Sequence, residues 1–186
     1  IENTMLEINR LVTKFKTKEI RFWDDVFTMN EKFTIEICKE LKKYGLIWSC
    51  NARVNMINPN MLTHMKDAGC WAVDFGIESG NDRILKVIKK EFDTRKASEA
   101  IKMVKRSGIE VRAFFILGFP EETMETVQDT INFAVSNDID YATFYLAHAY
   151  PGTRLYEIAQ KEGSLEKDFS KFLVTGKDPS YINKKI

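Results

Sequence analysis

Hydrophobic and polar residues follow two alternating patterns along most of this chain. Short, nearly continuous apolar runs of strand length are each followed by a longer segment in which apolar residues recur every three or four positions, as on one face of a helix. This order predicts parallel strands joined by right-handed helical crossovers. The predicted strands are Glu19–Trp23, Leu46–Cys50, Trp71–Ile77, Glu110–Leu117 and Asp140–Ala147.

Capping residues and glycines mark the ends of the predicted helices. Thr28 and Glu31 have the spacing of a capping box, and Asn58 stands before Pro59, which suits the first helical position. The predicted helices run from Leu6 to Phe15, from Thr28 to Tyr44, from Pro59 to Gly69, from Asn81 to Lys89, from Thr94 to Ser107, from Thr123 through Phe133, and from Thr153 to Gly163.

The periodicity alone does not choose between a (β/α) barrel and an open doubly wound sheet. The chain opens on a helix, and five strands are fewer than the eight of a closed barrel. We therefore expect an α/β fold, a partial (β/α) TIM-type barrel of five or so parallel strands over residues 1–165. Residues 166–186 are expected to be an irregular C-terminal tail that packs on the barrel through Phe169, Phe172 and Leu173.

Polar clusters follow the predicted strands. The third strand contains Asp74 and runs into Glu78, which is flanked by Gly76 and Gly80. In α/β sheets and barrels the ligand sits at the carboxyl ends of the strands, so these polar ends are expected to converge on one site.

Composition narrows the class of protein. Apolar residues make up 44% and charged residues 30% of the 186, as in an ordinary globular protein. The 28 Lys and Arg against 27 Asp and Glu give a net charge of +1, which offers no electrostatic reason to expect a nucleic acid partner. No apolar run reaches the roughly 20 residues of a membrane span. We expect a cytoplasmic protein.

The three cysteines, Cys38, Cys50 and Cys70, are widely spaced and form no CxxC pair. An odd number without a framework argues against disulfides, and buried apolar positions suit these side chains better than a metal site built by this chain alone.

Four strings in order resemble the radical S-adenosylmethionine (SAM) enzymes, in the branch that often carries a cobalamin-binding domain before the barrel. They begin at Ile20 (IRFWDDVF), Trp48 (WSCNAR), Phe75 (FGIESG) and Tyr150 (YPGTRLY). The match covers roughly residues 1 to 165. It implies that the intact protein cleaves SAM at a reduced [4Fe-4S] cluster to methionine and a 5′-deoxyadenosyl radical, with methyl transfer or oxidative cyclisation as possible outcomes.

The resemblance assigns cofactor-binding roles at three strand ends. Glu78, with Ser79 beside it, matches the carboxylate that accepts hydrogen bonds from the ribose of SAM, and capping of the next helix is its alternative role. Asp24 or Asp25 matches the anion that holds the methionyl ammonium, or else caps the following helix. Arg53 matches a residue that pairs with a carboxylate of SAM or substrate; a surface ion pair is the alternative.

The last two strand ends complete the expected site. Ile116 and Gly118, followed by Glu122, match the stretch along adenine, although Ile116 suits core packing equally well. Tyr145 could stack on the purine, with core packing as the alternative, and His148 could contact the substrate or have no such role.

One family feature is missing. The cluster requires a CxxxCxxC motif, and these 186 residues contain none. We expect a shortened chain that has lost its first strand and cluster loop, with a natural cluster-free homologue as the alternative. SAM and the [4Fe-4S] cluster are thus expected cofactors of the intact protein, cobalamin is a further candidate from the branch that the chain resembles, and this chain alone is expected to be inactive.

Two other functions stay open at this stage. One is a non-catalytic module that binds an adenine nucleotide. The other is a metal-independent barrel enzyme of the aldolase or phosphosugar type with Glu78 or Asp74 as base, although no glycine-rich phosphate loop or strand-end lysine supports it. The substrate is not identified. Exposed strand edges would favour a homodimer.

Overall fold

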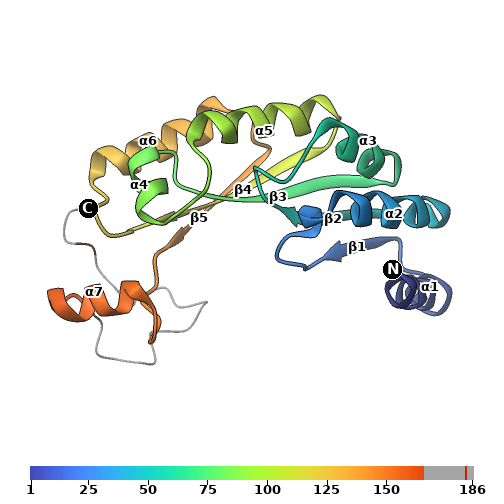
Figure 1. The fold of residues 1–186 in the computed structure, drawn as a ribbon, viewed down its shortest axis with the longest axis horizontal. Coiled ribbons are helices and arrows are strands. Elements are labelled where there is room, and N and C mark those ends of the chain that lie inside the picture. Colours follow the sequence, from blue (N-terminus) through green and yellow to red (C-terminus); the bar gives the residue numbers. More distant parts are fainter. Residues whose placement is uncertain (166–182, 184–186) are drawn as a thin grey trace. The chain divides into compact units, whose positions relative to one another are not determined.

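A computed structural model describes residues 1–165 and residue 183, so the predicted packing of Phe169, Phe172 and Leu173 lies outside the described residues (Figure 1). The strands are β1 (Glu19–Phe22), β2 (Ile47–Ala52), β3 (Cys70–Glu78), β4 (Glu110–Leu117) and β5 (Tyr141–Leu146). The helices are α1 (Glu2–Phe15), α2 (Glu31–Leu41), α3 (Pro59–Asp67), α4 (Asp82–Val87), α5 (Thr94–Arg106), α6 (Met124–Ser136) and α7 (Arg154–Glu162), with short 3-10 turns η1 (Phe27–Met29) and η2 (Lys42–Tyr44).

The strands follow one another across a single parallel sheet in the order β1-β2-β3-β4-β5. In the β1–β2 pair Arg21 lies opposite Ser49, and in the β2–β3 pair Asn51 lies opposite Asp74. The register of the second pair shifts between Trp48 and Ser49.

The chain divides into two compact units. Unit 1 comprises Ile1–Gly76, Arg95–Ala113 and Asn137–Ala142, and unit 2 comprises Ile77–Thr94, Phe114–Ser136 and Thr143–Ile186. Unit 1 therefore holds β1, β2 and the amino-terminal parts of β3, β4 and β5, and unit 2 holds the carboxyl-terminal residues of these last three strands.

An aromatic cluster organises the core of unit 1. The rings of Phe22, Phe27 and Trp48 lie 4.7 to 5.5 Å apart between centroids. Trp48 is fully buried, and its indole Nε1 donates a 2.8 Å hydrogen bond to the carbonyl of Ala68. A buried indole N–H needs such a partner, so this bond fixes the end of α3 against β2.

The predicted helices and strands are found, with ends that differ by a few residues. The capping-box prediction is wrong, because Asn30 and not Thr28 caps α2, and its side chain accepts from the Phe33 amide at 3.0 Å. Thr28 lies buried in η1 instead. Asn58 and Thr153 cap α3 and α7 as predicted.

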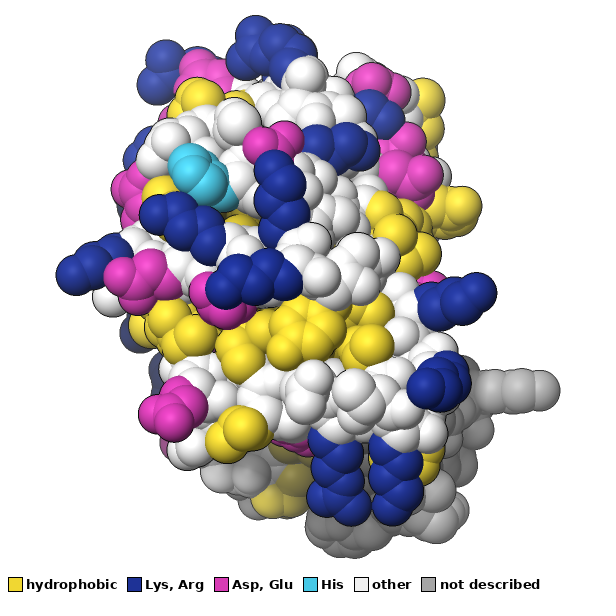
Figure 2. Space-filling view, turned by 90° about the vertical axis from the view of Figure 1, so that its right-hand side faces the viewer, with side chains coloured by type: hydrophobic (Ala, Val, Ile, Leu, Met, Phe, Trp, Pro, Cys, Tyr) yellow, Lys and Arg dark blue, Asp and Glu magenta, His cyan; other side chains and the backbone are white. Residues whose placement is uncertain are grey.

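One face of unit 1 exposes a band of apolar side chains, which Figure 2 shows running across the molecule. Around α1 and α2 the exposed large apolar residues include Ile1, Leu6, Phe15, Met29 and Phe33. In the part of the chain that the structure describes, no helix has the length and hydropathy to cross a membrane.

Two glycines at helix ends allow a matched test of this packing. Gly45 and Gly69 both have positive φ, +62° and +91°, but a Cβ on Gly69 would lie 2.1 Å from the carbonyl oxygen of Leu46, whereas a Cβ on Gly45 meets nothing within 4 Å. Both alanine variants incur left-handed strain, and only Gly69→Ala adds overpacking of about 1–3 kcal/mol. Urea unfolding of both variants measures this, and equal losses of stability would contradict the packing described here.

Candidate functional site

Glu78 stands at the carboxyl end of β3 in an unusual backbone conformation. Its φ of 72° is in the left-handed region, which non-glycine residues seldom adopt and which often marks a functional position. Its carboxylate Oε1 lies 3.2 Å from Nζ of Lys90, and both side chains are largely shielded, at 19% and 25% exposure. A carboxylate has further acceptor positions beyond one such bond, so Glu78 is held in place and still able to accept hydrogen bonds from a ligand.

The residues after Glu78 are fixed against α6. The Ser79 hydroxyl is fully buried 3.2 Å from the Thr130 hydroxyl, which also accepts from the Gly80 amide at 3.0 Å. A Cβ on Gly80 would lie only 2.4 Å from Cβ of Phe133. Asn81 then caps α4 and donates to Asp129 at 2.7 Å. The strand end is thus rigid, and Ser79 contributes to that rigidity from inside the protein.

A tight turn follows β4. Gly118 has a φ of +97°, and its amide donates to Oε2 of Glu122 at 2.5 Å, while the Phe119 amide donates to the same oxygen at 3.1 Å. Glu122 is fully buried, and its Oε1 has no hydrogen-bond partner among the described residues. Burial raises the pKa of the Glu122 carboxyl, and the two amide donors partly oppose that rise. Glu122 therefore shapes the turn that presents Gly118.

The other predicted residues of unit 2 are more accessible. Ile116 is half-buried, and Tyr145 on β5 is 53% exposed with its ring centroid 6.1 Å from that of Phe114. His148 lies beside Tyr150, with 6.0 Å between the ring centroids. Tyr145 is thus too exposed to be a core residue in this structure, and its ring is available to a ligand.

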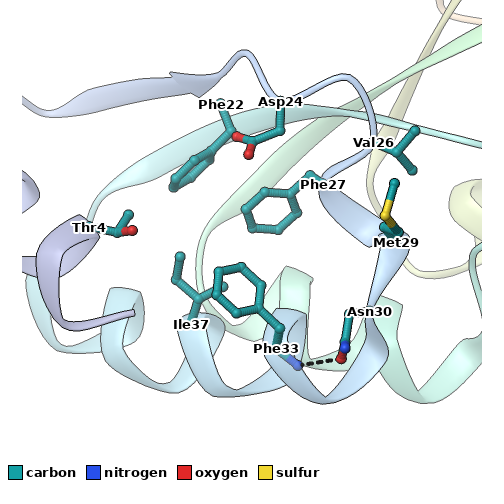
Figure 3. A pocket seen from close by; sticks show the side chains of 9 residues that line it. All are labelled: Thr4, Phe22, Asp24, Val26, Phe27, Met29, Asn30, Phe33 and Ile37. Carbon is teal, nitrogen blue, oxygen red and sulfur yellow. Dashed lines mark hydrogen bonds between the residues drawn. The ribbon is translucent and has the colours of Figure 1, made fainter.

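The predicted residues of unit 1 follow β1 and β2. Asp24 lines a cavity of about 300 Å³ together with Phe22, Phe27 and Phe33 (Figure 3). Its carbonyl accepts from the Asn51 side chain at 3.0 Å. Asp25 is exposed and does not line this cavity, and Arg53 is half-buried after β2. Both aspartates and Arg53 stay predictions as ligands.

Sequence reasoning missed the partners that hold the site. Lys90 lies in the loop after α4, and Thr130 lies on α6, about fifty residues beyond the strand end that it anchors. Neither carries a local sequence signal. The close contact at Gly80 was the available hint, because a glycine beside a strand end often marks a close approach of another backbone.

The thiols are unsuited to an iron–sulfur cluster. All three cysteines are free and buried. Burial, with the nearby Cys70 thiol, raises the pKa of Cys38 to about 12. A hydrogen bond with Cys70, followed by burial, raises the pKa of Cys50 well above its usual range. Within residues 1–165 and 183, no group of three or more His, Cys, Asp or Glu side chains could hold a metal ion. These residues do not fit the cluster.

Comparison with known families identifies the class of protein. The model of the Radical SAM superfamily matches residues 1–134. The chain belongs to the radical SAM superfamily.

Its relatives include methyltransferases. An uncharacterised methyltransferase of Pyrococcus horikoshii is 44% identical over 161 residues, which cover 86% of this chain and 35% of that protein. Cytidylyl-2-hydroxyethylphosphonate methyltransferase of Streptomyces wedmorensis is 27% identical over 95% of this chain and 35% of that protein. The chain thus spans about a third of the length of these relatives.

The fold agrees with a solved enzyme of the superfamily. TsrM of Kitasatospora setae, a radical SAM methyltransferase solved with cobalamin and a [4Fe-4S] cluster bound, superposes with a TM-score of 0.73 at 15% identity, covering 96% of this chain and 37% of that chain. The likeness confirms the predicted partial (β/α) barrel.

The raised thiol pKa values predict low reactivity. At pH 8 Cys38 and Cys50 are protonated and buried, so alkylation of the native protein by iodoacetamide should be at least about tenfold slower than in urea, because the thiolate is the reactive form. Peptide mass spectrometry reads each cysteine separately. Rapid native labelling of Cys38 at pH 8 would show that its thiol is neither buried nor shifted.

The raised pKa of Glu122 predicts that the free energy of unfolding depends on pH. Its folded pKa is raised above the ordinary 4.5, so the folded state binds the proton more tightly than the unfolded state. The resulting stabilisation is complete below the unfolded pKa and is lost as pH rises through the folded pKa. Glu122→Gln should therefore be more stable than wild type at pH 8, and the gap should close at pH 4.

Urea unfolding at both pH values measures this difference. Glu125→Gln, at an exposed position in the first turn of α6, is the control and should show no such gap. A Glu122→Gln variant that is less stable than wild type at pH 8 contradicts the assigned pKa shift.

Proposed function

We propose that this chain is the SAM-binding part of a radical SAM methyltransferase. The observation that carries the proposal is the Glu78 carboxylate at the end of β3, held in a left-handed conformation, oriented by Lys90 and anchored through Gly80 to α6. Membership of the superfamily and the methyltransferase relatives support the reaction class.

Glu78 would accept hydrogen bonds from the ribose hydroxyls of SAM. Two vicinal hydroxyls present two donors, and an ionised carboxylate offers paired acceptors whose hydrogen bonds are stronger than those of neutral groups. The ion pair with Lys90 sets the direction of the carboxylate before the ligand arrives, which lowers the ordering cost of binding. When bound, SAM supplies the methyl group or the radical chemistry of the family.

The turn after β4 and the exposed tyrosine would hold the adenine. Gly118 presents its backbone in a conformation fixed by Glu122, Ile116 offers an apolar side chain, and the Tyr145 ring offers a stacking surface. Asp24 or Asp25 and Arg53 are proposed for the charged methionyl end, where an ammonium and a carboxylate require opposite charges.

In this proposal, the residues that would bind the [4Fe-4S] cluster and cobalamin are not among those of this chain. The described cysteines do not fit the cluster, so three thiolates would come from a part of the polypeptide beyond these 186 residues. A cobalamin domain would likewise lie outside them. We also propose a cytoplasmic protein, and a homodimer paired through strand edges, because all six residues of β5 are exposed.

The structure disfavours the aldolase-type alternative. Asp74, one of its two candidate bases, has both carboxylate oxygens engaged by Arg21 and Arg112, so neither oxygen is placed to take a proton from a substrate.

A charge-neutral substitution tests the ribose contact. Glu78→Gln keeps the shape of the side chain but replaces a charged acceptor with an amide, so SAM affinity in the intact protein should fall by about 1.5–3 kcal/mol, and cluster content should not change. Isothermal titration of SAM measures the affinity.

Glu121→Gln is the matched control. Glu121 also has a positive φ, of 68°, and pairs with an arginine, Arg83, at 3.6 Å, but its side chain is 57% exposed. Its loss should leave SAM affinity unchanged. Unaltered SAM binding in Glu78→Gln removes the main support for the proposal.

A further inference from the structure

Two arginines share one buried aspartate in unit 1. Asp74 on β3 is 1% exposed. Its Oδ2 lies 2.5 Å from Nη2 of Arg21 on β1, and its Oδ1 lies 2.5 Å from Nε of Arg112 on β4. A second bond of 3.0 Å joins Arg112 Nη2 to Oδ2. Three strands therefore contribute to one charged cluster, which we call the arginine cluster.

The arginine cluster faces away from the packed core. Side chains alternate between the two faces of a strand, and the neighbours of these residues, Phe22, Val73, Phe75, Val111 and Ala113, are the ones buried in the core. The cluster residues accordingly lie on the opposite face of the sheet, which is the face that lines the interior in a (β/α) barrel.

Two indoles hold the guanidinium groups in place. The Arg21 guanidinium carbon lies 4.1 Å from the ring centroid of Trp23, and that of Arg112 lies 5.1 Å from the ring centroid of Trp71. Trp71 is fixed in turn, because its Nε1 donates to Glu19 at 3.0 Å. Stacking and the carboxylate together leave little conformational freedom, so these arginines are preorganised.

The cluster has more positive charge and more donors than Asp74 can satisfy. In the described part of the chain, Asp74 is the carboxylate that pairs with both guanidinium groups, so one of the two positive charges has no ion-pair partner there, and the nearby Glu19 bonds Trp71 instead. In the part of the chain that the structure describes, Arg21 Nε is buried and has no hydrogen-bond partner. Such an unpaired charged donor is costly inside a protein. The side chains of Arg21 and Arg112 keep 31% and 20% exposure, so a small ligand can reach them.

We propose that Arg21 and Arg112, positioned by Asp74, bind an anionic group of the substrate, a carboxylate or a phosphate. Planar guanidinium groups suit the paired oxygens of such groups. An anion here would neutralise the excess charge and supply an acceptor for Arg21 Nε. Asp74 is the positioning residue, and the arginines are the binding residues. Assignment to the substrate depends on the proposed function, whereas the existence of the anion site does not.

Inorganic phosphate serves as the probe for the site. The thermal midpoint of the intact protein is measured in a phosphate titration, with chloride controls at equal ionic strength. Arg21→Gln leaves Asp74 paired with Arg112, so the fold is retained, and phosphate affinity should fall at least about tenfold, as for a lost charged hydrogen bond. Arg112→Gln should have the same effect. Arg95→Gln, at an exposed position on α5, is the matched control and should bind as wild type.

Asp74→Asn tests the positioning role of the carboxylate. Without it the two guanidinium groups lose the ion pairs that orient them, so phosphate affinity should fall although the positive charge of the cluster increases. A rise in phosphate affinity would show that Asp74 only neutralises the arginines, and would overturn its positioning role. Phosphate binding that is absent in wild type, or identical in wild type and both arginine variants, overturns the anion site.

A titration of SAM distinguishes a carboxylate of the substrate from the carboxylate of SAM as the group that the arginines bind. SAM affinity should be the same in Arg21→Gln and wild type if the site takes the substrate. A loss of SAM affinity in Arg21→Gln would assign the arginines to the carboxylate of SAM and overturn the substrate assignment. Failure of the proposed function would instead appear in Glu78→Gln, a separate variant in unit 2.

Discussion

The close approach of α6 to the end of β3 is the constraint on which the candidate site depends. Gly80 lies so near Phe133 that no side chain fits, and Thr130 bonds both the Ser79 hydroxyl and the Gly80 amide. These contacts fix the chain immediately after Glu78. The left-handed conformation of Glu78 persists because its surroundings hold it, and the ion pair with Lys90 directs its carboxylate.

Side chains alternate between the two faces of each strand, so core residues and charged residues of β3 lie on opposite faces of the sheet. In β3 the side chains of Val73, Phe75 and Ile77 are fully buried in the core, whereas Asp74 and Glu78 belong to the other alternate set of positions. One set of positions thus maintains the fold, and the other carries charge. In β4, Arg112 likewise stands between the buried residues Val111 and Ala113.

Much of the fold was predictable from local signals. The helices and strands could be located from the period of the apolar residues, from apolar runs of strand length, from Asn58 before Pro59 and from the glycines that follow helices. These signals act within a few residues of the chain. The α2 cap was mispredicted because Thr28 and Asn30 both suit a cap, and tertiary packing placed Thr28 in a buried turn.

The candidate site was only partly predictable. Glu78 could be singled out because it ends an apolar strand between glycines. The sequence did not single out Lys90, Thr130 or the two arginines that hold Asp74. Each of their contacts joins residues that lie between 12 and 53 positions apart in the chain. Which partner a charged strand residue finds depends on register and on the neighbouring strands, and the sequence of one strand contains neither.

Hydrogen–deuterium exchange of the intact protein with and without SAM tests the central claim most directly. If SAM binds at these strand ends, amides in peptides covering residues 77–81 and 116–122 should exchange more slowly when SAM is present, while exposed positions of α5 around Arg95 and Glu99 should not change. If exchange in both strand-end peptides is unchanged while SAM is demonstrably bound, SAM does not bind at these strand ends.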